Sequence, residues 1–508
     1  MQHDVRLETM DANALRVLAA ELIEKLALKD RELHARQVKI DKLTHEMALL
    51  KRWRFAARSE QHHGTQGSLL EETLEADLAA IGLELEALRV PREDAPKQPP
   101  KRLPLPAHLP RIEVRHEPQT TTCGCGCELR RIGEDVSEKL DYTPGVFRVE
   151  RHVRGKWACA KCERLVQAPV PAQVIDKGIP TAGLLAQVLV AKYADHAPLY
   201  RQEAIFGRAG LAIPRSTLAQ WVGVCGVRLQ PLVEAMKDAL LARLVLHADE
   251  TPVAMLKPGH GKTHRAYLWS YCSTVFDPFQ AVVYDFAETR GGQHPKAFLG
   301  AWSGALVCDD YSGYKGLFEK GVTEAGCLAH ARRKFHDLWA NHRSQVAAEA
   351  LEIYRDLYDV ERDVKALDAE ARRQERQQRS KPICEKLHTW LLLHRQKVPD
   401  GTAIAKAIDY SLGRWEALVR FLDNGHLPID NTWVENRIRP IALGRANWLF
   451  AGSLRAGQRA AAVMSIIQSA KLNGHDPYGY LKDVLERLPT QPHRRIEELL
   501  PHRWQPTT

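Results

Sequence analysis

The stretch VLHADETPV, residues 245–253, places Asp249 and Glu250 side by side directly after an apolar run. The run has the composition of a buried β-strand, and successive side chains of a strand point to opposite faces of its sheet. Only one acid of the pair can therefore enter a given site. We expect Asp249 to point into a site formed with distant partners, and Glu250 to face away, towards solvent or a neighbouring basic group.

Further β-type runs follow this stretch along the chain. They read AYLWSYCS, QAVVYDFA and ALVCDDY, and a helical candidate, HPKAFLGAW, precedes the last of them. Residues 329–425 are then strongly helical, and a helix that begins near Asn431 carries NTWVENRIRP. These runs predict a sheet whose last strand is followed, after a long helical stretch, by a helix that bears an acid.

Carboxylates border three of these elements. Asp249 ends the first apolar run, Asp309 and Asp310 end ALVCDDY, and Glu435 lies on the NTWVENRIRP helix. Convergent carboxylates can hold Mg²⁺ or Mn²⁺, and two such ions about 3.5–4 Å apart stabilise both oxygens of a phosphodiester displacement. Without cations the cluster is costly, because neighbouring carboxylates raise one another's pKa.

Each acid also has a structural alternative. Asp249 could cap a turn before Pro252. Glu435 could pair with Arg439, four residues further along the same helix.

The bulk properties are those of a chain with several domains. Its 508 residues exceed what one hydrophobic core supports, and 44% apolar with 27% charged residues is ordinary for a globular protein. No apolar run approaches the ~20 residues of a membrane span, and no signal peptide is recognisable, so we expect a cytoplasmic protein. The net charge of +9 favours a polyanionic partner weakly, although basic residues gather at 50–58, 331–335 and 436–440.

Residues 11–58 lack Pro and Gly and predict one long helix. Apolar residues repeat every seven positions along one seam, at Leu26, Leu33, Ile40 and Met47. A second seam contains Leu43 and Leu50 but also Lys29 and Arg36, so the heptad pattern is imperfect. We expect self-association through this helix, and the alternative is that it packs on its own domain.

Five of the ten cysteines gather after a Pro-rich charged stretch at 91–110, which predicts an extended linker. They precede and follow a β-type segment, and this layout indicates a zinc ribbon. Tetrahedral zinc needs four ligands, so one of the first three cysteines is surplus, and Cys125 is the firmest ligand. The candidate zinc ligands are Cys123, Cys125, Cys127, Cys159 and Cys162.

The segment LYRQEAIFGRAGLAIPRSTLAQWV has the spacing of a helix-turn-helix, with a turn at Gly210 and a second helix from Pro214 or Arg215. The second helix would present polar side chains suited to phosphates and base edges. These are Arg215, Ser216, Thr217 and Gln220. A helical hairpin used only for packing is the alternative.

Four blocks together, HADETPV, CDDYSGYKGL, GCLAHARRKF and PIDNTWVENRIRPIALGRANWLFAGS, closely resemble the catalytic blocks of the DDE transposases of the insertion-sequence-sixty-six family, the TnpC type. The likeness extends to IGEDVSEKLDYTPGVFRVERHVRGKWACAKC, which resembles the zinc-binding module of the family, and to the helical N-terminal region. It covers nearly the whole chain. The resemblance implies an RNase H-like catalytic core in which a large helical insertion separates the second acid from the third.

Carried onto this sequence, the resemblance implies a catalytic, Mg²⁺-binding triad of Asp249, Asp309 and Glu435. The family pattern D-x-Y-x-G-Y fits Asp309 and leaves Asp310 at its variable position. The pair Cys327-x-x-His330 resembles a signature of several DDE groups, and we expect it to have a structural or supporting role. Phosphate-binding side chains are expected near the glutamate, at Arg437, Arg439 and Arg445.

The function implied is that of a DNA transposase, which binds the terminal inverted repeats of an insertion sequence, cuts its ends and transfers them to target DNA. The implied cofactors are Mg²⁺ (or Mn²⁺) and Zn²⁺, and the implied partners are double-stranded DNA and two small accessory proteins of the same element. One alternative is a DNA-binding regulator or an inactive domesticated relative. The second alternative is a nuclease that cuts nucleic acid without joining the ends to a target.

We therefore expect a multidomain α+β protein. Its expected parts are a coiled-coil and DNA-binding helical region (1–90), a Pro-rich linker (91–115), a zinc ribbon (116–172), a helix-turn-helix-like region (173–240), the first part of an RNase H-like core (241–335), a helical insertion (336–425) and the second part of the core with the glutamate helix and a helical tail (426–508).

Overall fold

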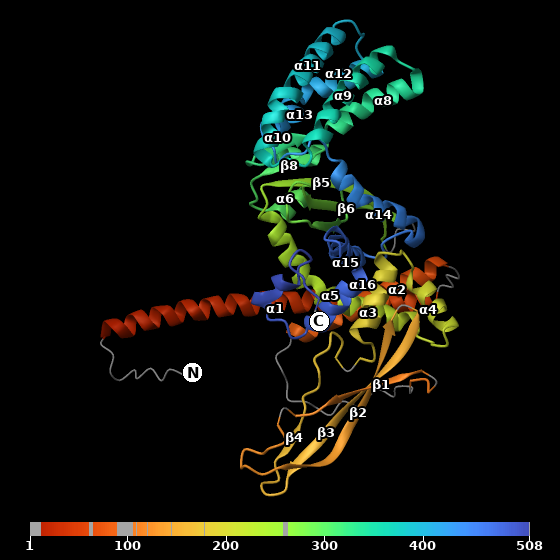
Figure 1. The fold of residues 1–508 in the computed structure, drawn as a ribbon. Helices are drawn as coiled ribbons and strands as arrows, with labels where there is room; N and C mark the ends of the chain where they lie inside the picture. The colour runs from red at the N-terminus through yellow and green to blue at the C-terminus, as the bar shows by residue number, and fades with distance from the viewer. Residues whose placement is uncertain are drawn as a thin grey trace.

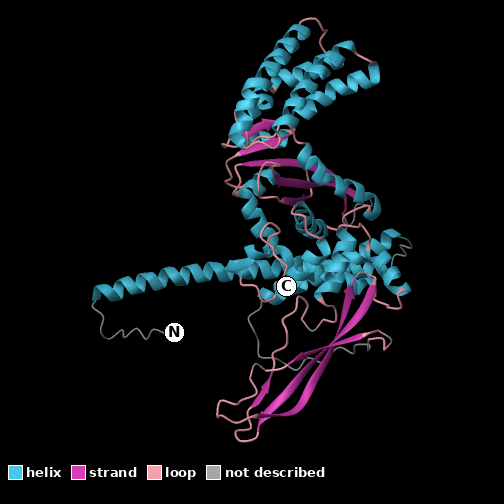
Figure 2. Ribbon diagram, viewed as in Figure 1, coloured by secondary structure: helices cyan, strands magenta, loops and turns pink. Residues whose placement is uncertain are grey.

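The computed structural model describes residues 12–59, 65–88, 105–107, 109–118, 120–143, 145–176, 178–257 and 263–506. The described residues form helices and two separate sheets, one of five strands and one of four (Figures 1 and 2). In the view of Figure 1 a lobe of helices lies above the five-stranded sheet, a layer of helices lies below it, and the four-stranded sheet extends from the bottom. The expected mixed α+β architecture is confirmed.

The five-stranded sheet has the strand order β7-β6-β5-β8-β9. Strands β5, β6 and β7 form an antiparallel meander, whereas β8 and β9 run parallel to β5. Helix α6 (Gln293–Leu299) lies between β7 and β8 in the chain and provides the crossover that a parallel neighbour requires. The strand bounds are Val245–Leu256 for β5, Thr263–Ser273 for β6, Val282–Ala287 for β7, Ala305–Cys308 for β8 and Thr323–Gly326 for β9.

Strand β7 is an edge of this sheet, and helix α15 (Leu454–Leu472) covers it. An uncovered edge leaves backbone N–H groups without partners. Here the N–H of Val282 donates to Ser469 Oγ at 3.0 Å, and that of Tyr284 donates to Ser465 Oγ at 2.8 Å. The two serines, one turn apart on α15, therefore close the edge.

Helix α14 (Thr432–Trp448) packs against β5 and β6, and it begins where the sequence predicted, directly after Asn431. The C-terminal tail continues through α16 (Pro477–Arg487) and the short helix η5 (His493–Leu499). None of the described helices is long and apolar enough to cross a membrane.

The helices between β9 and α14 form a lobe with its own hydrophobic core. Fully buried Arg376 helps to close the lobe, because it pairs with Glu361 and donates to the carbonyls of Phe421 and Leu427. The lobe contains the predicted insertion 336–425, although its first helix starts earlier. Its helices are α8 (Leu328–His342), α9 (Gln345–Val364), α10 (Ala369–Glu375), η3 (Arg376–Ser380), α11 (Lys381–Arg395), α12 (Ala403–Gly413), α13 (Trp415–Val419) and η4 (Arg420–Leu422).

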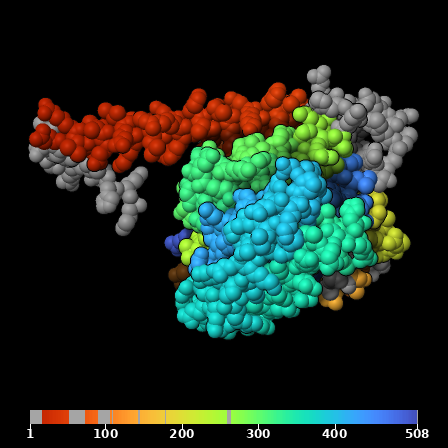
Figure 3. All heavy atoms as spheres, turned by 90° about the horizontal axis from the view of Figure 1, so that it is seen from above, coloured from red at the N-terminus to blue at the C-terminus, as the bar shows by residue number. Residues whose placement is uncertain are grey.

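One long N-terminal helix is present, α1 (Ala12–Ser59), as the sequence predicted. Its second half packs against α2 (Thr65–Leu88), where Leu43 and Leu50 are buried. In the first half, which extends away from the body of the molecule (Figures 1 and 3), Leu26 and Leu33 are 62% and 57% exposed. The heptad seam is therefore divided between packing on the same chain and an open surface.

The four-stranded sheet contains β1 (Arg111–His116), β2 (Leu129–Thr143), β3 (Val146–Cys159) and β4 (Leu165–Gln167). Strand β1 pairs with β3, so the last residues of the predicted linker 91–115 belong to this sheet instead. Residues 91–104 of that linker lie outside the described residues, as do most side chains of the basic segment at 50–58.

Between this sheet and the five-stranded sheet lie α3 (Ala182–Tyr193), α4 (Leu199–Arg208) and α5 (Arg215–Leu241). Helices α4 and α5 meet at Gly210, whose φ of +81° is a conformation that favours glycine. Helix α5 packs against α2 so closely that a Cβ on Gly223 would come within 2.2 Å of the carbonyl oxygen of Ala76.

Candidate active site and zinc site

Three acids lie on neighbouring elements of the five-stranded sheet. Asp249 is in β5, and Asp309 directly follows β8, which pairs with β5 in parallel register. Glu435 lies in the first turn of α14, the helix packed against β5 and β6. Asp249 Oδ1 accepts a hydrogen bond from the N–H of Glu250, and Asp309 Oδ1 accepts one from the N–H of Tyr311.

Burial raises the pKa of Asp249 well above its ordinary value. The charges of Glu250, Asp309 and Glu435 raise it further, so each of these three acids is near enough to Asp249 to repel its charge. A bound cation would reverse this repulsion, and carboxylate oxygens are the ligands that Mg²⁺ and Mn²⁺ prefer. Three carboxylates are therefore a donor set of the kind that suits a divalent metal.

Glu435 contacts the lobe rather than the other two acids. Its Oε1 lies 3.7 Å from His330 Nε2, and Arg333 Nη2 donates to its Oε2 at 3.3 Å. Ligand atoms of Cys327, His330 and Glu435 lie within 4.8 Å of one another, whereas the three acids are not among the groups that meet this limit in the described part of the chain. The Cys-x-x-His pair thus reaches the glutamate, which the sequence did not predict.

Asn431 fixes the start of α14 relative to β5. It is fully buried; its Oδ1 lies 2.8 Å from His247 Nδ1, and its side-chain amide donates to the carbonyl of Ala248 at 3.0 Å. Its backbone N–H donates to Cys327 Sγ. Burial lowers the pKa of His247 to about 4, so this imidazole is neutral at pH 7. A single asparagine therefore connects the elements that carry Asp249, Cys327 and Glu435.

Glu250 was expected to face either solvent or a neighbouring basic group, and the structure shows the second. Its side chain is only 2% exposed, so it does not face solvent. It pairs instead with a basic group, Arg290, whose Nη2 lies 2.5 Å from Oε1. Burial raises the pKa of Glu250, while Arg290 and the hydroxyl of Tyr314 oppose that shift.

The three arginines of α14 have different surroundings. Arg437 is half-buried and stacks on the ring of Trp433 at 4.0 Å, and Arg445 donates to the carbonyl of Pro252 at 2.8 Å. Arg439 is exposed. Of the three, Arg439 has the side chain most accessible to a phosphate.

The predicted recognition residues lie at the start of α5. Arg215, Ser216 and Thr217 are half-buried, and Gln220 is exposed but within 3.5 Å of Glu75 on α2. The backbone N–H of Arg215 donates to Glu203. Two helices joined by a turn are present, as both alternatives require, and α2 lies beside Gln220 of the second helix.

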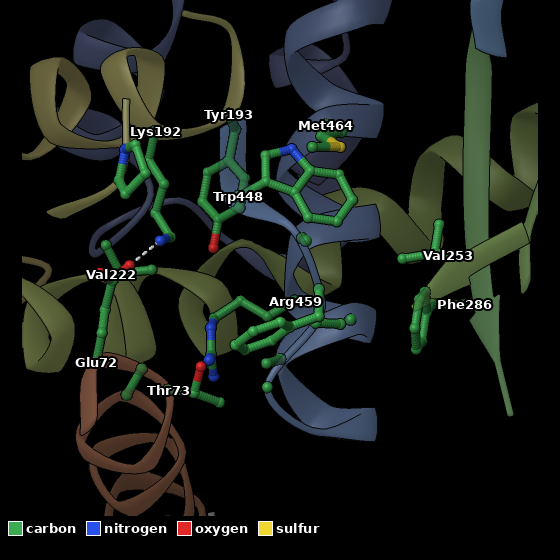
Figure 4. Close-up of a pocket in the computed structure, with 18 of the residues that line it drawn as sticks. Glu72, Thr73, Lys192, Tyr193, Val222, Val253, Phe286, Trp448, Arg459 and Met464 are labelled. Carbon is green, nitrogen blue, oxygen red and sulfur yellow. Dashed lines mark hydrogen bonds and ion pairs between the residues drawn. The ribbon is translucent and has the colours of Figure 1, made fainter. Parts of the chain in front are cut away.

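A cavity of about 90 Å³ lies between α2, α3, α5, the sheet and the end of α14. Figure 4 shows the rings of Tyr193 and Trp448 and the ion pair between Lys192 and Glu72 among the side chains that line it. None of the three acids lines it. This cavity is therefore separate from the candidate active site.

Four cysteines come together at one end of the four-stranded sheet. Cys123, Cys125, Cys159 and Cys162 have sulfur atoms within 4.8 Å of one another, and the Cys125–Cys159 and Cys125–Cys162 distances are 3.7 and 3.9 Å. Tetrahedral zinc with bonds of about 2.3 Å needs sulfurs about 3.8 Å apart. Backbone N–H groups of Cys162 and Lys161 lower the pKa of Cys159, which favours a thiolate. The cluster fits zinc, and Cys127 is outside it.

Comparison with known protein families places this chain among the transposases. The family described as "Transposase IS66 family" matches residues 177–459, and "IS66 C-terminal element" matches residues 465–502. The "zinc-finger binding domain of transposase IS66" matches residues 120–163, and "Transposase C of IS166 homeodomain" matches residues 42–114. The chain belongs to the IS66 transposase family.

Two similar proteins can be aligned with this chain along nearly its full length. The protein y4qI of Sinorhizobium fredii is 38% identical over 508 residues, which cover 96% of this chain and 93% of the relative. The protein y4hP of the same organism is 34% identical over 495 residues, covering 92% and 88%. Both are described as uncharacterized proteins, so the family alone, and not these relatives, supports an activity.

Proposed function

We propose that this chain cuts DNA at the ends of an insertion sequence and joins those ends to target DNA, with Asp249, Asp309 and Glu435 as ligands of Mg²⁺. The observation that carries the proposal is the position of these acids on β5, at the end of β8 and on the first turn of α14. The strand order and the mixture of antiparallel and parallel pairs support the expected RNase H-like core.

Asp249, Asp309 and Glu435 would hold Mg²⁺, and the bound metal would supply activation of the attacking hydroxyl group and neutralisation of charge on the phosphodiester oxygens. The side chains around the acids would bind the metal and the phosphates. In this structure Glu435 pairs with Arg333, so a metal held by Glu435 would compete with that ion pair and release a guanidinium that is 55% exposed. Arg333, together with exposed Arg439, can then bind phosphates beside the acids.

The other parts would bind and bring together the DNA ends. We assign recognition of the inverted repeats to the four-cysteine module and to the start of α5, through Arg215, Ser216, Thr217 and Gln220. The exposed half of α1 would pair two copies, and Arg437 and Arg445 would support α14. Two small accessory proteins of the same element would assist, and the reaction would take place on DNA in the bacterial cytoplasm.

The test is incubation of the full-length protein with its end DNA, a target plasmid and Mg²⁺. The wild-type protein should give cut ends and joined products, and Asp309→Asn should bind the ends but join them at least roughly a thousandfold more slowly, about 4 kcal/mol in barrier. Asp310→Asn is the matched control, because Asp310 pairs with Arg414 of the lobe, and it should retain joining.

Each rival function gives a different result. A regulator or inactive relative would bind ends and cut nothing, and a nuclease would cut without forming joined products. Persistent joining by Asp309→Asn would remove Asp309 from the triad.

A further inference from the structure

Both carboxylate oxygens of Glu250 are bound by side chains from other elements. Arg290, from the loop after β7, donates to Oε1 through Nε at 2.7 Å and approaches it through Nη2 at 2.5 Å. The hydroxyl of Tyr314 donates to Oε2 at 2.9 Å. Glu250 therefore joins β5 to two loops on the same side of the sheet.

These contacts continue to the middle acid. The guanidinium of Arg290 lies over the ring of Tyr311 at 3.9 Å, and the Tyr311 hydroxyl donates to the carbonyl of Arg290. The N–H of Tyr311 in turn donates to Asp309 Oδ1 at 3.0 Å. A continuous set of contacts thus runs from Glu250 through Arg290 and Tyr311 to Asp309.

The loop after β7 and the loop after β8 approach each other so closely that two positions have no room for a side chain, and both are glycines. A Cβ on Gly313 would lie 2.2 Å from the ring of Tyr311, and a Cβ on Gly292 would lie 2.5 Å from the carbonyl oxygen of Gly313. Beneath them fully buried Trp269, the cross-strand neighbour of Glu250, meets the rings of Tyr311 and Tyr314 at 6.1 and 5.9 Å. The loop that carries Asp309 is therefore held from several sides.

We propose that Glu250 is a positioning residue, which holds the loop 309–314 through Arg290 and Tyr314 and so sets the position of Asp309 relative to Asp249. Asp249 and Glu250 are adjacent in the chain, so one acid faces the metal while its neighbour fixes the partner acid. This inference rests on the proposed function, because it concerns the geometry of the same metal site.

A direct ligand role for Glu250 is the competing interpretation. The Tyr314→Phe substitution separates the two, since it removes one hydroxyl and leaves the Glu250 carboxylate in place. A positioning role requires metal binding to weaken in this variant. A ligand role requires binding to be unchanged or tighter, because the carboxylate loses a competing donor.

The experiment measures Mn²⁺ binding to the full-length, zinc-loaded protein by electron paramagnetic resonance, alongside the thermal midpoint and end-DNA binding. Tyr314→Phe and Glu250→Gln should each weaken Mn²⁺ binding by about tenfold, the effect expected for loss of a hydrogen bond to a charged group. End-DNA binding should be unchanged. Glu250→Gln also removes the charge partner of Arg290, and Tyr314→Phe remains informative if that variant fails to fold.

Glu361→Gln is the matched control, because Glu361 is likewise a mostly buried carboxylate paired with an arginine, Arg376, but it lies in the helical lobe. It should lower the thermal midpoint and leave Mn²⁺ affinity at the wild-type value. Asp309→Asn should abolish the binding, and if it does not, the proposed metal site itself is wrong. If Asp309→Asn abolishes binding while Tyr314→Phe and Glu250→Gln bind Mn²⁺ as the wild type does, the positioning role is wrong and the metal site stands.

Discussion

Cys125 and Cys127 stand two positions apart and differ in their relation to the four-sulfur group. Cys125 belongs to the four-sulfur group, and Cys127 does not. We predict that Cys125→Ser loses zinc and unfolds the ribbon, because structural zinc supplies a large share of the folding free energy of a module with little core. Cys127→Ser should keep about one zinc per chain.

Zinc content by atomic absorption and amide exchange of β2 and β3 would measure both effects. Equal zinc loss in the two variants would show that Cys127 is a ligand after all.

The site shows how far single residues could be predicted from the sequence. The three acids were predicted from the apolar elements that they border and from a family pattern. The partners of Glu250 were not, since Arg290 and Tyr314 lie 40 and 64 residues away and carry no signal that links them to it. Arg333 was noticed only as part of a basic stretch, because its contact with Glu435 depends on how α8 packs.

At the scale of elements, helix α1 was predicted almost to the residue, and its packing was only half foreseen. A heptad seam indicates that a helix has a partner but does not identify the partner. Here α2 covers the seam at Leu43 and Leu50 and ends before Leu33. Likewise the β-type runs predicted the strands, whereas the inclusion of β1 in the lower sheet was missed because it follows directly on a Pro-rich segment.

Because one half of α1 packs on α2 and the other half is exposed, substitutions in the two halves should have different effects. Leu43→Ala should lower the local unfolding free energy of the α1–α2 pair by about 2–5 kcal/mol, because it leaves a cavity in their core. Leu26→Ala should change it by less than about 0.5 kcal/mol, because Leu26 is exposed, but should weaken self-association.

Amide exchange reports the first effect and analytical ultracentrifugation the second. Sedimentation of Leu26→Ala identical to that of the wild type would exclude the first half of α1 from the contact between copies.

At the scale of the whole molecule, the order of the parts was predictable and their arrangement in space was not. Composition changes and cysteine spacing separate the domains along the chain. The docking of the lobe involves contacts between distant residues, such as that of Arg414 with Glu324 of β9. The same holds for Glu435, whose ion pair with Arg333 depends on how the lobe is placed beside α14.

The central claim, that Asp249, Asp309 and Glu435 share a metal site, is tested most directly by anomalous diffraction from crystals of the full-length protein soaked in Mn²⁺. The account predicts manganese peaks between the three carboxylates, with Glu435 turned away from His330 and Arg333. Peaks confined to Cys327, His330 and Glu435, or no peak near Asp249 and Asp309, would contradict it.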